Sequence, residues 1–459
     1  MSEALAVGTD QRVVDAGAIQ WWRSIAWLLF LGPFFFLSYG AANEWAAGLE
    51  QVASIRYDWE RAIPFMPWTI VPYWSIDLLY GLAFLFCRSV RAVDRLALRL
   101  LAVQLVSVAC FVLFPLRFGG GQPEVVGVFA PLFAALRAFD QPFNQAPSLH
   151  IGLLVVIWAQ FAHHSPPRWR VLIHAWALLI FVSVLSTWQH HFIDLPTGAL
   201  VGALALWLWP DESEAPLAGF RLTRDAERRQ LAARYAAASA VFALPALAGG
   251  AWLWSLWVSL SLALLSLIHL GPGSAGFQKM HGRHSVAVRM LLAPYLLAAR
   301  INPRLWSRRR PDRDLISDEV WLGALPTRLE PINGRLPALL DLTAELPAPH
   351  NAAHYRNHAW LDLIPPQPAA LAQAAHSIEA LRAHGPVLVC CALGYGRSAA
   401  AVAAWLVLSG RAPDATEAIV HIRARRPRIV LRPPHLHALQ ALAAHAPCAE
   451  IPLTAPAQT

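Results

Sequence analysis

The chain has 459 residues, of which 56% are hydrophobic and 14% are charged, and its mean hydropathy is +0.42. This is more apolar than a soluble globular protein needs to be, which excludes an entirely soluble protein. The formal net charge of +8 comes almost wholly from arginines that lie between apolar runs, which favours anionic lipid headgroups as partners and argues against nucleic acid.

The first 270 residues are dominated by apolar runs that predict membrane-spanning helices. A spanning helix needs about 20 mostly apolar residues. Eight candidates precede the change in composition, at 21–39, 68–87, 100–116, 149–162, 171–188, 195–209, 235–249 and 251–270. No small-residue cleavage site follows the first run, so we expect it to remain as a signal anchor.

Arginine gathers in every second connection between these runs. The arginine-rich connections lie at 88–99, 168–170 and 221–234. Because positively charged loops stay on the cytosolic side, these loops and both chain termini are predicted to be cytosolic. The pattern therefore predicts a multi-pass protein of a bacterial-type inner (plasma) membrane, with the other loops on the periplasmic side.

We predict three parts along the chain. Residues 1–210 form a membrane domain with six spans, residues 211–310 add two spans and an interfacial linker that ends in the basic run 308–310, and residues 311–459 form a soluble domain. In the last part the apolar runs VWLGAL, ALLDLT and VLVCC alternate with helical patterns. This alternation predicts an α/β fold with some parallel strands.

The membrane part carries polar residues that the predicted topology brings to one side. His150 begins the fourth span, and the fifth span returns to deliver His190 and Asp194 to the same outer side, where Arg117 ends the third span. Two histidines and a carboxylate suit phosphoryl transfer through histidine. We expect Asp194 to orient His190 as nucleophile, His150 to protonate the leaving group, and Arg117 to bind phosphate.

Two short motifs in this part resemble those of the type 2 phosphatidic acid phosphatase superfamily, especially its inositol-phosphorylceramide synthase-like branch. They are PSLH, which ends at His150, and the H-x3-D spacing of His190 and Asp194; no lysine-led first motif is present. The resemblance implies that Ser148 binds phosphate and that a phosphatase or transferase site faces the periplasm. We interpret His191 as an interfacial neighbour of this site.

The soluble part contains a strand-like run, the loop CALGYGRS, and an apolar helix. Loop amides and a helix N-terminus can hold phosphate oxygens, and Gly394 and Gly396 permit the backbone turns this requires. Arg397 can bind two oxygens, and the positive surroundings favour a thiolate at Cys391 that attacks phosphorus. Ser398 can stabilise that thiolate by a hydrogen bond.

Cys391, Arg397 and Ser398 match the C-x5-R-S pattern, and residues 315–442 resemble a dual-specificity phosphatase, with RARRPRI similar to that family's late arginine-rich turn. The resemblance implies that Asp362 is the general acid; we interpret its competitor Asp341 as structural. Cys390 stands where the family usually has histidine. It is either a buried strand residue or a redox partner of Cys391.

The leading hypothesis is therefore a membrane-bound phosphatase that hydrolyses phosphomonoesters, on phospholipid phosphates, through a cysteinyl-phosphate intermediate. Three alternatives remain: a phospholipid headgroup transferase with an auxiliary phosphatase domain, a protein tyrosine or serine/threonine phosphatase, and a non-catalytic phosphate sensor. The chemistry requires no cofactor and no metal. The expected partners are a phosphomonoester substrate and the lipid bilayer, with no nucleic acid.

Overall fold

The computed structural model describes residues 2–307 and 313–445, so the predicted basic run at 308–310 lies outside the described residues. The chain divides into two compact units. One contains residues 1–215 and 246–253, and the other contains residues 216–245 and 254–459. The chain thus passes from one unit to the other near residue 216, and residues on both sides of position 310 belong to one unit. The predicted domain boundaries at 210 and 310 stay predictions.

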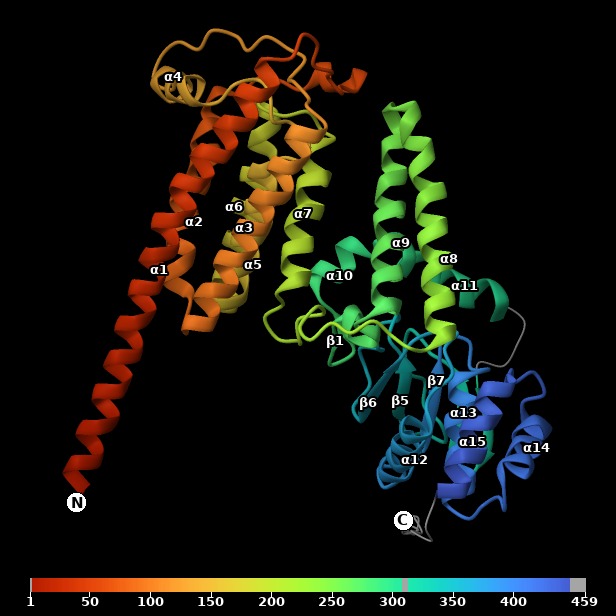
Figure 1. The fold of residues 1–459 in the computed structure, drawn as a ribbon. Coiled ribbons are helices and arrows are strands. Elements are labelled where there is room, and N and C mark those ends of the chain that lie inside the picture. The colour runs from red at the N-terminus through yellow and green to blue at the C-terminus, as the bar shows by residue number, and fades with distance from the viewer. Residues whose placement is uncertain (1, 308–312, 446–459) are drawn as a thin grey trace. The chain divides into compact units, whose positions relative to one another are not determined.

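The first unit is a set of mostly apolar helices (Figure 1). Its α-helices are α1 (Ser2–Ala47), α2 (Ile70–Ala83), α3 (Val90–Leu113), α4 (Ala130–Phe139), α5 (Leu149–His164), α6 (Pro167–Ser186) and α7 (Asp194–Leu208). Glycines let α5 and α7 approach closely, because a Cβ atom on Gly198 would lie 2.3 Å from the carbonyl oxygen of Ser148. This contact brings the start of α5 beside the start of α7.

Six helices in the described part of the chain are long and apolar enough to cross a membrane, judged by length and composition. They are Gln20–Ala47, Pro67–Phe86, Val90–Leu113, Pro167–Ser186, Ala226–Ala248 and Gly250–Leu270. Two of the eight predicted spans form the shorter apolar helices α5 and α7, of 16 and 15 residues. A multi-helix membrane region agrees with these lengths, and the count of eight spans stays a prediction.

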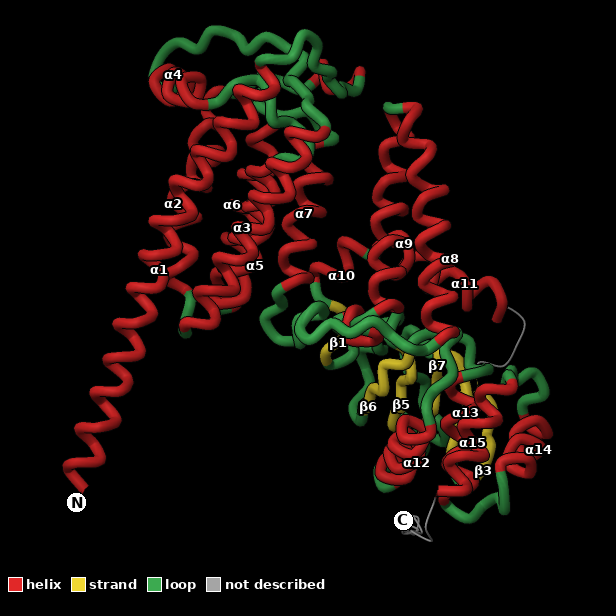
Figure 2. The backbone as a smooth tube through the Cα atoms, viewed as in Figure 1, coloured by secondary structure: helices red, strands yellow, loops and turns green. Residues whose placement is uncertain are grey.

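The second unit combines further helices with a five-stranded sheet (Figure 2). Its α-helices are α8 (Ala226–Ala243), α9 (Ser255–Leu270), α10 (Val286–Leu291), α11 (Ala293–Ser307), α12 (Pro368–Arg382), α13 (Arg397–Leu408), α14 (Ala415–Arg425) and α15 (Pro433–His445). Its strands are β1 (Lys279–Met280), β2 (Arg283–His284), β3 (Arg313–Ser317), β4 (Val320–Ala324), β5 (Ala338–Thr343), β6 (Tyr355–Trp360) and β7 (Val387–Cys391).

The large sheet has the strand order β3-β4-β7-β5-β6, and only β3 runs antiparallel to its neighbour. The three apolar runs named from the sequence are β4, β5 and β7, so the predicted α/β fold with parallel strands is confirmed. Side chains of α12 to α15 form the main core with one face of the sheet, to which β5 contributes Ala338, Leu340 and Leu342. The alternate residues of β5 therefore point to the opposite face.

The small hairpin β1–β2 docks on that opposite face near the end of β5. The ammonium group of Lys279 donates hydrogen bonds to Asp341 Oδ2 at 2.6 Å and to the carbonyl oxygen of Thr343 at 2.8 Å. The side chains of Lys279 and Asp341 are 1% and 0% exposed. His284 contacts the carbonyl oxygen of Ala344 at 2.8 Å. The hairpin is thus part of the body that carries the sheet, and the prediction that Asp341 is structural agrees with this network.

Candidate active sites

The predicted phosphate loop joins β7 to α13, with Cys391 as the last residue of the strand and Arg397 as the first of the helix. The Cys391 thiol is buried and lies 3.2 Å from the hydroxyl of Ser398. Four neighbouring strands of the sheet run parallel, so their carboxyl ends meet at one edge, where ligands bind in open α/β sheets. The loop lies at that edge.

Close packing fixes the shape of the loop. Gly394 has a φ of +73°, and a Cβ atom there would lie 2.4 Å from the carbonyl carbon of Gly323. Only glycine meets both constraints at this position. The Nε of Arg426 donates to the carbonyl oxygen of Gly394 at 2.8 Å, while its Nη1 pairs with Asp314 at 2.6 Å. Arg426 belongs to the predicted arginine-rich turn, and the structure identifies it as the member that anchors the loop.

Arg397 is buried and is held by several acceptors. Its guanidinium forms a bidentate pair with Glu345, at 2.6 and 3.0 Å, and donates to the carbonyl oxygen of Trp360 at 2.9 Å. Burial works against the charge, but the carboxylates of Glu345 and Asp362 outweigh it and raise the pKa of Arg397. Arg397 therefore stays charged, in a fixed orientation.

Glu345 is the site residue that the sequence interpretation missed. It lies just beyond the carboxyl end of β5 and is fully buried, with its side chain 3% exposed. Burial would raise the pKa of this carboxyl, but the charge and hydrogen bonds of Arg397 lower it overall. The sequence did contain a signal for Glu345. It is an acidic residue directly after a strand that runs parallel to β7, and such a residue lies at the same edge of the sheet as Cys391.

Asp362 follows β6, and its Oδ1 lies 3.0 Å from Nη2 of Arg397, so the structure brings the predicted acid to the predicted phosphate ligand. Its side chain is 47% exposed. The protein around the carboxyl still removes part of its hydration, and this desolvation raises the pKa of Asp362, with Arg397 opposing the rise and Glu345 adding to it. The carboxyl thus keeps its proton to a higher pH than an ordinary aspartate, as a proton donor requires.

The residue after Asp362 is connected through Arg432 to α8 of the same unit. Leu363 has a φ of +63°, and its carbonyl oxygen accepts a hydrogen bond from Arg432 at 2.5 Å. The same guanidinium pairs with Glu227 of α8 at 3.2 Å. Arg432 therefore connects the turn that carries Asp362 to a helix that is apolar enough to cross a membrane.

Cys390 points away from the nucleophile position. It is 0% exposed and packs with Leu329, Leu339 and Leu388, whereas Cys391 belongs to the core on the helix-covered face. Burial raises the pKa of the Cys390 thiol well above its usual range. Successive strand residues face opposite sides of a sheet, so this placement favours the interpretation of Cys390 as a buried strand residue.

In the first unit the structure brings together part of the predicted histidine site. His190 Nδ1 lies 3.2 Å from Asp194 Oδ2, and the backbone N–H of Ser148 donates to the carbonyl oxygen of Asp194 at 2.9 Å. The Ser148 hydroxyl accepts a hydrogen bond from the N–H of Ile151, which caps α5. Because Asp194 contacts Nδ1 of His190, the other ring nitrogen, Nε2, is the one that can react with a substrate.

His150 and Arg117 are placed differently from expectation. The ring of His150 stacks on Tyr73, with 4.3 Å between centroids, and its buried Nε2 has no hydrogen-bond partner among the described residues. Arg117 is exposed, and neither residue lines the cavity of about 160 Å³ that His190 and His191 border. Arg56 lines that cavity instead. The backbone N–H of Arg117 donates to the carbonyl oxygen of Ala53 at 2.9 Å.

His191, which was interpreted as an interfacial neighbour, is a buried member of this cluster. Its Nδ1 lies 2.9 Å from Glu60 Oε2, and its Nε2 accepts a hydrogen bond from the N–H of Gly119 at 2.9 Å. The ring also stacks on Phe118, with centroids 4.5 Å apart. His191 and Glu60 therefore hold the loop after α3 against the segment that carries His190.

Comparison with known proteins bears on the C-terminal part. Residues 364–444 match the family model described as dual specificity phosphatase, catalytic domain. Similar solved structures include PTPMT1 in complex with PI(5)P, with 24% identity over 29% of this chain and 96% of that chain and a TM-score of 0.25. Tk-PTP in the active form has 22% identity over 30% and 99% of the two chains, with a TM-score of 0.26.

Human DUSP28 has 20% identity over 29% of this chain and 94% of that chain, with a TM-score of 0.25. No curated protein matches the chain. The family match supports a cysteine-based phosphatase domain of the dual-specificity type in the C-terminal part. The matched range begins at residue 364 and therefore does not include Asp362.

Proposed function

We propose that the chain is a membrane-bound phosphatase that hydrolyses phosphomonoesters of phospholipids through a cysteinyl-phosphate intermediate at Cys391. The observation that carries this proposal is the cluster at the carboxyl edge of the sheet, where Arg397 contacts Asp362 at 3.0 Å and Ser398 contacts Cys391 at 3.2 Å. Lipid substrates are favoured because α8 and α9, which are apolar enough to span a bilayer, belong to the same compact unit as that cluster.

The proposed reaction has two steps. The Cys391 thiolate attacks phosphorus, the bond to the ester oxygen breaks, and Asp362 gives its proton to the departing alkoxide. Water then attacks the phosphocysteine, Asp362 takes a proton from that water, and inorganic phosphate leaves with the thiolate restored. Arg397 and the loop N–H groups bind the phosphoryl oxygens in both steps, and Glu345 keeps the guanidinium in place.

The proton-donor role can be tested by its leaving-group dependence. Asp362→Asn in the full-length protein should slow release of phosphate from alkyl phosphates about 100-fold, and from aryl phosphates much less, because an aryl leaving group needs little protonation. The raised pKa of Asp362 predicts the sign of the pH effect. Wild-type activity on alkyl phosphates should persist above the ordinary aspartate pKa and fall as pH rises through the raised value.

In Asp362→Asn this alkaline fall should disappear from the pH profile. A variant that hydrolyses alkyl phosphates at the wild-type rate would remove Asp362 as the acid. A phosphotyrosyl peptide hydrolysed far better than any lipid phosphate would instead favour the protein phosphatase alternative.

A second candidate function rests on the contact between His190 and Asp194 in the first unit. We propose that this pair forms a phosphatase or headgroup transferase site of the type 2 phosphatidic acid phosphatase kind. His190 is the nucleophile and Asp194 orients its ring. Ser148 and Arg56 are the phosphate-binding candidates near it. The predicted topology places this site on the periplasmic side.

The lipid composition of cells tests that second function. His190→Ala should abolish formation of the lipid product of this site and leave the aryl phosphatase activity of Cys391 intact, because the two sites belong to different units. Cys391→Ser is the matched control, and cells that carry it should keep the product made by the His190 site. A lipid profile unaffected by His190→Ala would contradict a catalytic role for the pair.

A further inference from the structure

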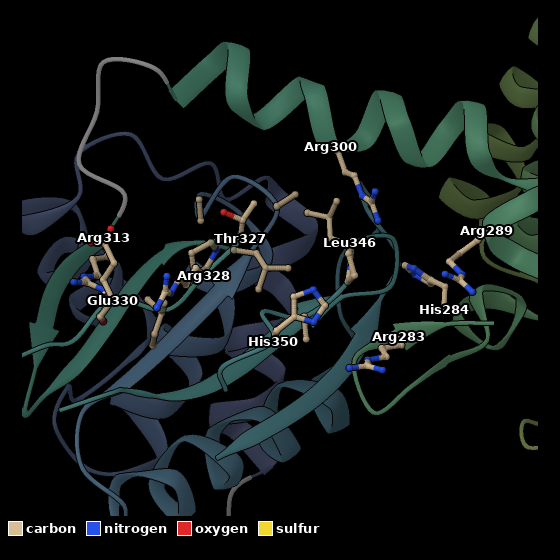
Figure 3. A pocket seen from close by; sticks show the side chains of 17 residues that line it. Arg283, His284, Arg289, Arg300, Arg313, Thr327, Arg328, Glu330, Leu346 and His350 are labelled. Carbon is tan, nitrogen blue, oxygen red and sulfur yellow. Dashed lines mark hydrogen bonds between the residues drawn. The ribbon is translucent and has the colours of Figure 1, made fainter. Parts of the chain in front are cut away.

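A cavity of about 1040 Å³ borders the proposed catalytic loop (Figure 3). Its walls include Ala324 at the end of β4, Leu346 just after β5, and Ala392, the residue that follows Cys391. Ala324 is also the register partner of Cys391. The cavity therefore lies at the same edge of the sheet as the nucleophile, on the face that the hairpin and Leu388 share, whereas the Cys391 side chain belongs to the core on the other face.

The cavity is strongly cationic. Its charged lining residues are Arg283, Arg289, Arg300, Arg313, Arg328 and Glu330. Five arginines against one acid give a formal charge of +4 when the histidines are neutral. None of these arginines takes part in the ion pairs formed between described residues. The cavity thus gathers positive charge that the described part of the protein does not neutralise.

The arginines approach from two sides. In Figure 3 Arg283, Arg289 and Arg300 come from the hairpin and the helices after it, while Arg313 and Arg328 come from β3 and the loop after β4. All five belong to one compact unit. The five arginines thus line one cavity, with Arg313 half-buried and the other four exposed.

The hairpin wall is held in a fixed position. Gly282 has a φ of +75°, its carbonyl oxygen accepts a hydrogen bond from the N–H of Ala348 at 2.8 Å, and a Cβ atom would lie 2.4 Å from Cβ of Ala348. Lys279 is bound to Asp341 on one side of this turn, and His284 to the carbonyl oxygen of Ala344 on the other. Arg283 is therefore presented to the cavity by an anchored backbone.

The charge and size of the cavity indicate the chemistry of its ligand. Guanidinium groups bind phosphate and carboxylate oxygens in a bidentate manner, so the five arginines favour an anionic ligand over a neutral sugar. A phosphate, which carries up to about two negative charges, matches the +4 lining better than a single carboxylate. The volume is that of a site for a whole small molecule, well beyond one phosphate. The proposed catalytic loop already provides for the phosphate that reacts. The cavity beside it suits another phosphate of the same molecule.

We infer that this cavity binds a second phosphate group of the substrate, so that the preferred substrates carry the reacting phosphomonoester together with a phosphodiester or another phosphomonoester in one headgroup. This inference rests on the proposed phosphatase function of Cys391 and adds the class of substrate. Arg283 and Arg300 are specificity-determining residues in it, because they bind the phosphate that does not react.

A lipid headgroup is the favoured source of this second phosphate. α9, which is apolar enough to span a membrane, ends at Leu270, and the hairpin that carries Arg283 begins at Lys279. The short connection keeps this wall of the cavity near the end of α9. A headgroup whose phosphodiester joins it to diacylglycerol presents both phosphates at the bilayer surface.

The experiment compares substrates with one and two phosphates, using the full-length protein in detergent micelles. The substrates are 4-nitrophenyl phosphate, dioleoylphosphatidic acid, dioleoylphosphatidylglycerol phosphate and the deacylated, water-soluble headgroup of the last lipid. In Arg283→Ala and Arg300→Ala the KM for both two-phosphate substrates should rise about tenfold or more, with kcat nearly unchanged, because each variant loses a charged hydrogen bond to bound phosphate.

The KM for the two one-phosphate substrates should change less than twofold in these variants, which also shows that the proteins are folded. Arg356→Ala is the matched control, since Arg356 is an exposed arginine of β6 that does not line the cavity. Equal KM increases for one-phosphate and two-phosphate substrates would overturn the inference, as would no increase at all.

An increase confined to the lipid, absent for the deacylated headgroup, would also overturn it and would assign the arginines to the membrane surface. A phosphotyrosyl peptide that shows the same arginine dependence would assign the cavity to protein substrates. A wild-type protein inactive toward 4-nitrophenyl phosphate would contradict the proposed phosphatase function itself, which separates that failure from failure of this inference.

Discussion

Cys391→Ser should lower phosphate release from an aryl phosphate by about three orders of magnitude or more, because a serine hydroxyl in the same place is not ionised near neutral pH. The loop that holds the residue should persist, since its shape depends on Gly394, Arg397 and Arg426 and not on the sulfur. Steady-state rates and thermal unfolding of the full-length protein measure the two effects separately.

Cys390→Ser is the matched control for this prediction. The neighbouring thiol is buried on the other face of the sheet, packed with Leu329, Leu339 and Leu388. A serine there places a hydroxyl among apolar side chains, so we expect some loss of stability while most of the activity remains. Equal loss of activity from the two substitutions, with both proteins folded, would show that the roles assigned to the two cysteines are wrong.

Lys279→Met should destabilise the unit that contains the sheet by about 3–5 kcal/mol, because it leaves the fully buried carboxylate of Asp341 without its cation. Asp341 would keep hydrogen bonds from Thr343 and Tyr355, which do not replace the lost charge. Thermal or denaturant unfolding, followed by near-ultraviolet circular dichroism, measures the loss.

The double substitution Lys279→Met with Asp341→Leu is the informative comparison. Removing both charges deletes the unpaired carboxylate, so the double variant should be more stable than Lys279→Met alone. Wild-type stability in the single variant would mean that the hairpin does not depend on this pair. The aryl phosphatase activity of the surviving folded fraction should be close to that of wild type, since neither residue touches the proposed nucleophile.

The catalytic loop could be predicted because its information is contiguous. One strand, five loop residues and one helix follow each other along the chain, and this strand–loop–helix order itself predicts a phosphate site. Asp362 lies outside this segment, so only the family resemblance suggested it. The 3.0 Å contact with Arg397 agrees with that suggestion, while its role in catalysis stays a prediction.

Glu345 and Arg426 show what a local pattern leaves out. Both act on the loop from distant segments, Glu345 through Arg397 and Arg426 through the carbonyl oxygen of Gly394. The run that contains Arg426 has four arginines, and no sequence pattern says which of them turns inward. The structure identifies Arg426 as the arginine that turns inward, because it is 5% exposed. Its ion pair with Asp314 offsets the free-energy cost of burying the guanidinium.

The hairpin before residue 310 had no sequence signal that could have revealed it. Its strands have two residues each, too short for an alternating pattern, and its stability comes from contacts with β5 and the segment after it. The predicted membrane cluster shows a related limit. His190 lies four residues before Asp194, the first residue of α7, and the two side chains lie 3.2 Å apart. The positions of His150 and Arg117 depend on helix rotation and loop direction, which span counting does not define.

The docked hairpin also limits how this protein can be divided for study. A soluble fragment that starts at residue 311 would include β5 but lack Lys279, and it would expose the surface that the hairpin covers. Such a fragment would carry an orphaned internal carboxylate and would lose Arg283 from the cationic cavity. Low activity of this fragment would then result from the missing hairpin and would not describe the full-length protein. A fragment that begins directly after Leu270 retains the hairpin but lacks Glu227 of α8, the partner of Arg432, so the full-length protein is the version suited to enzymology.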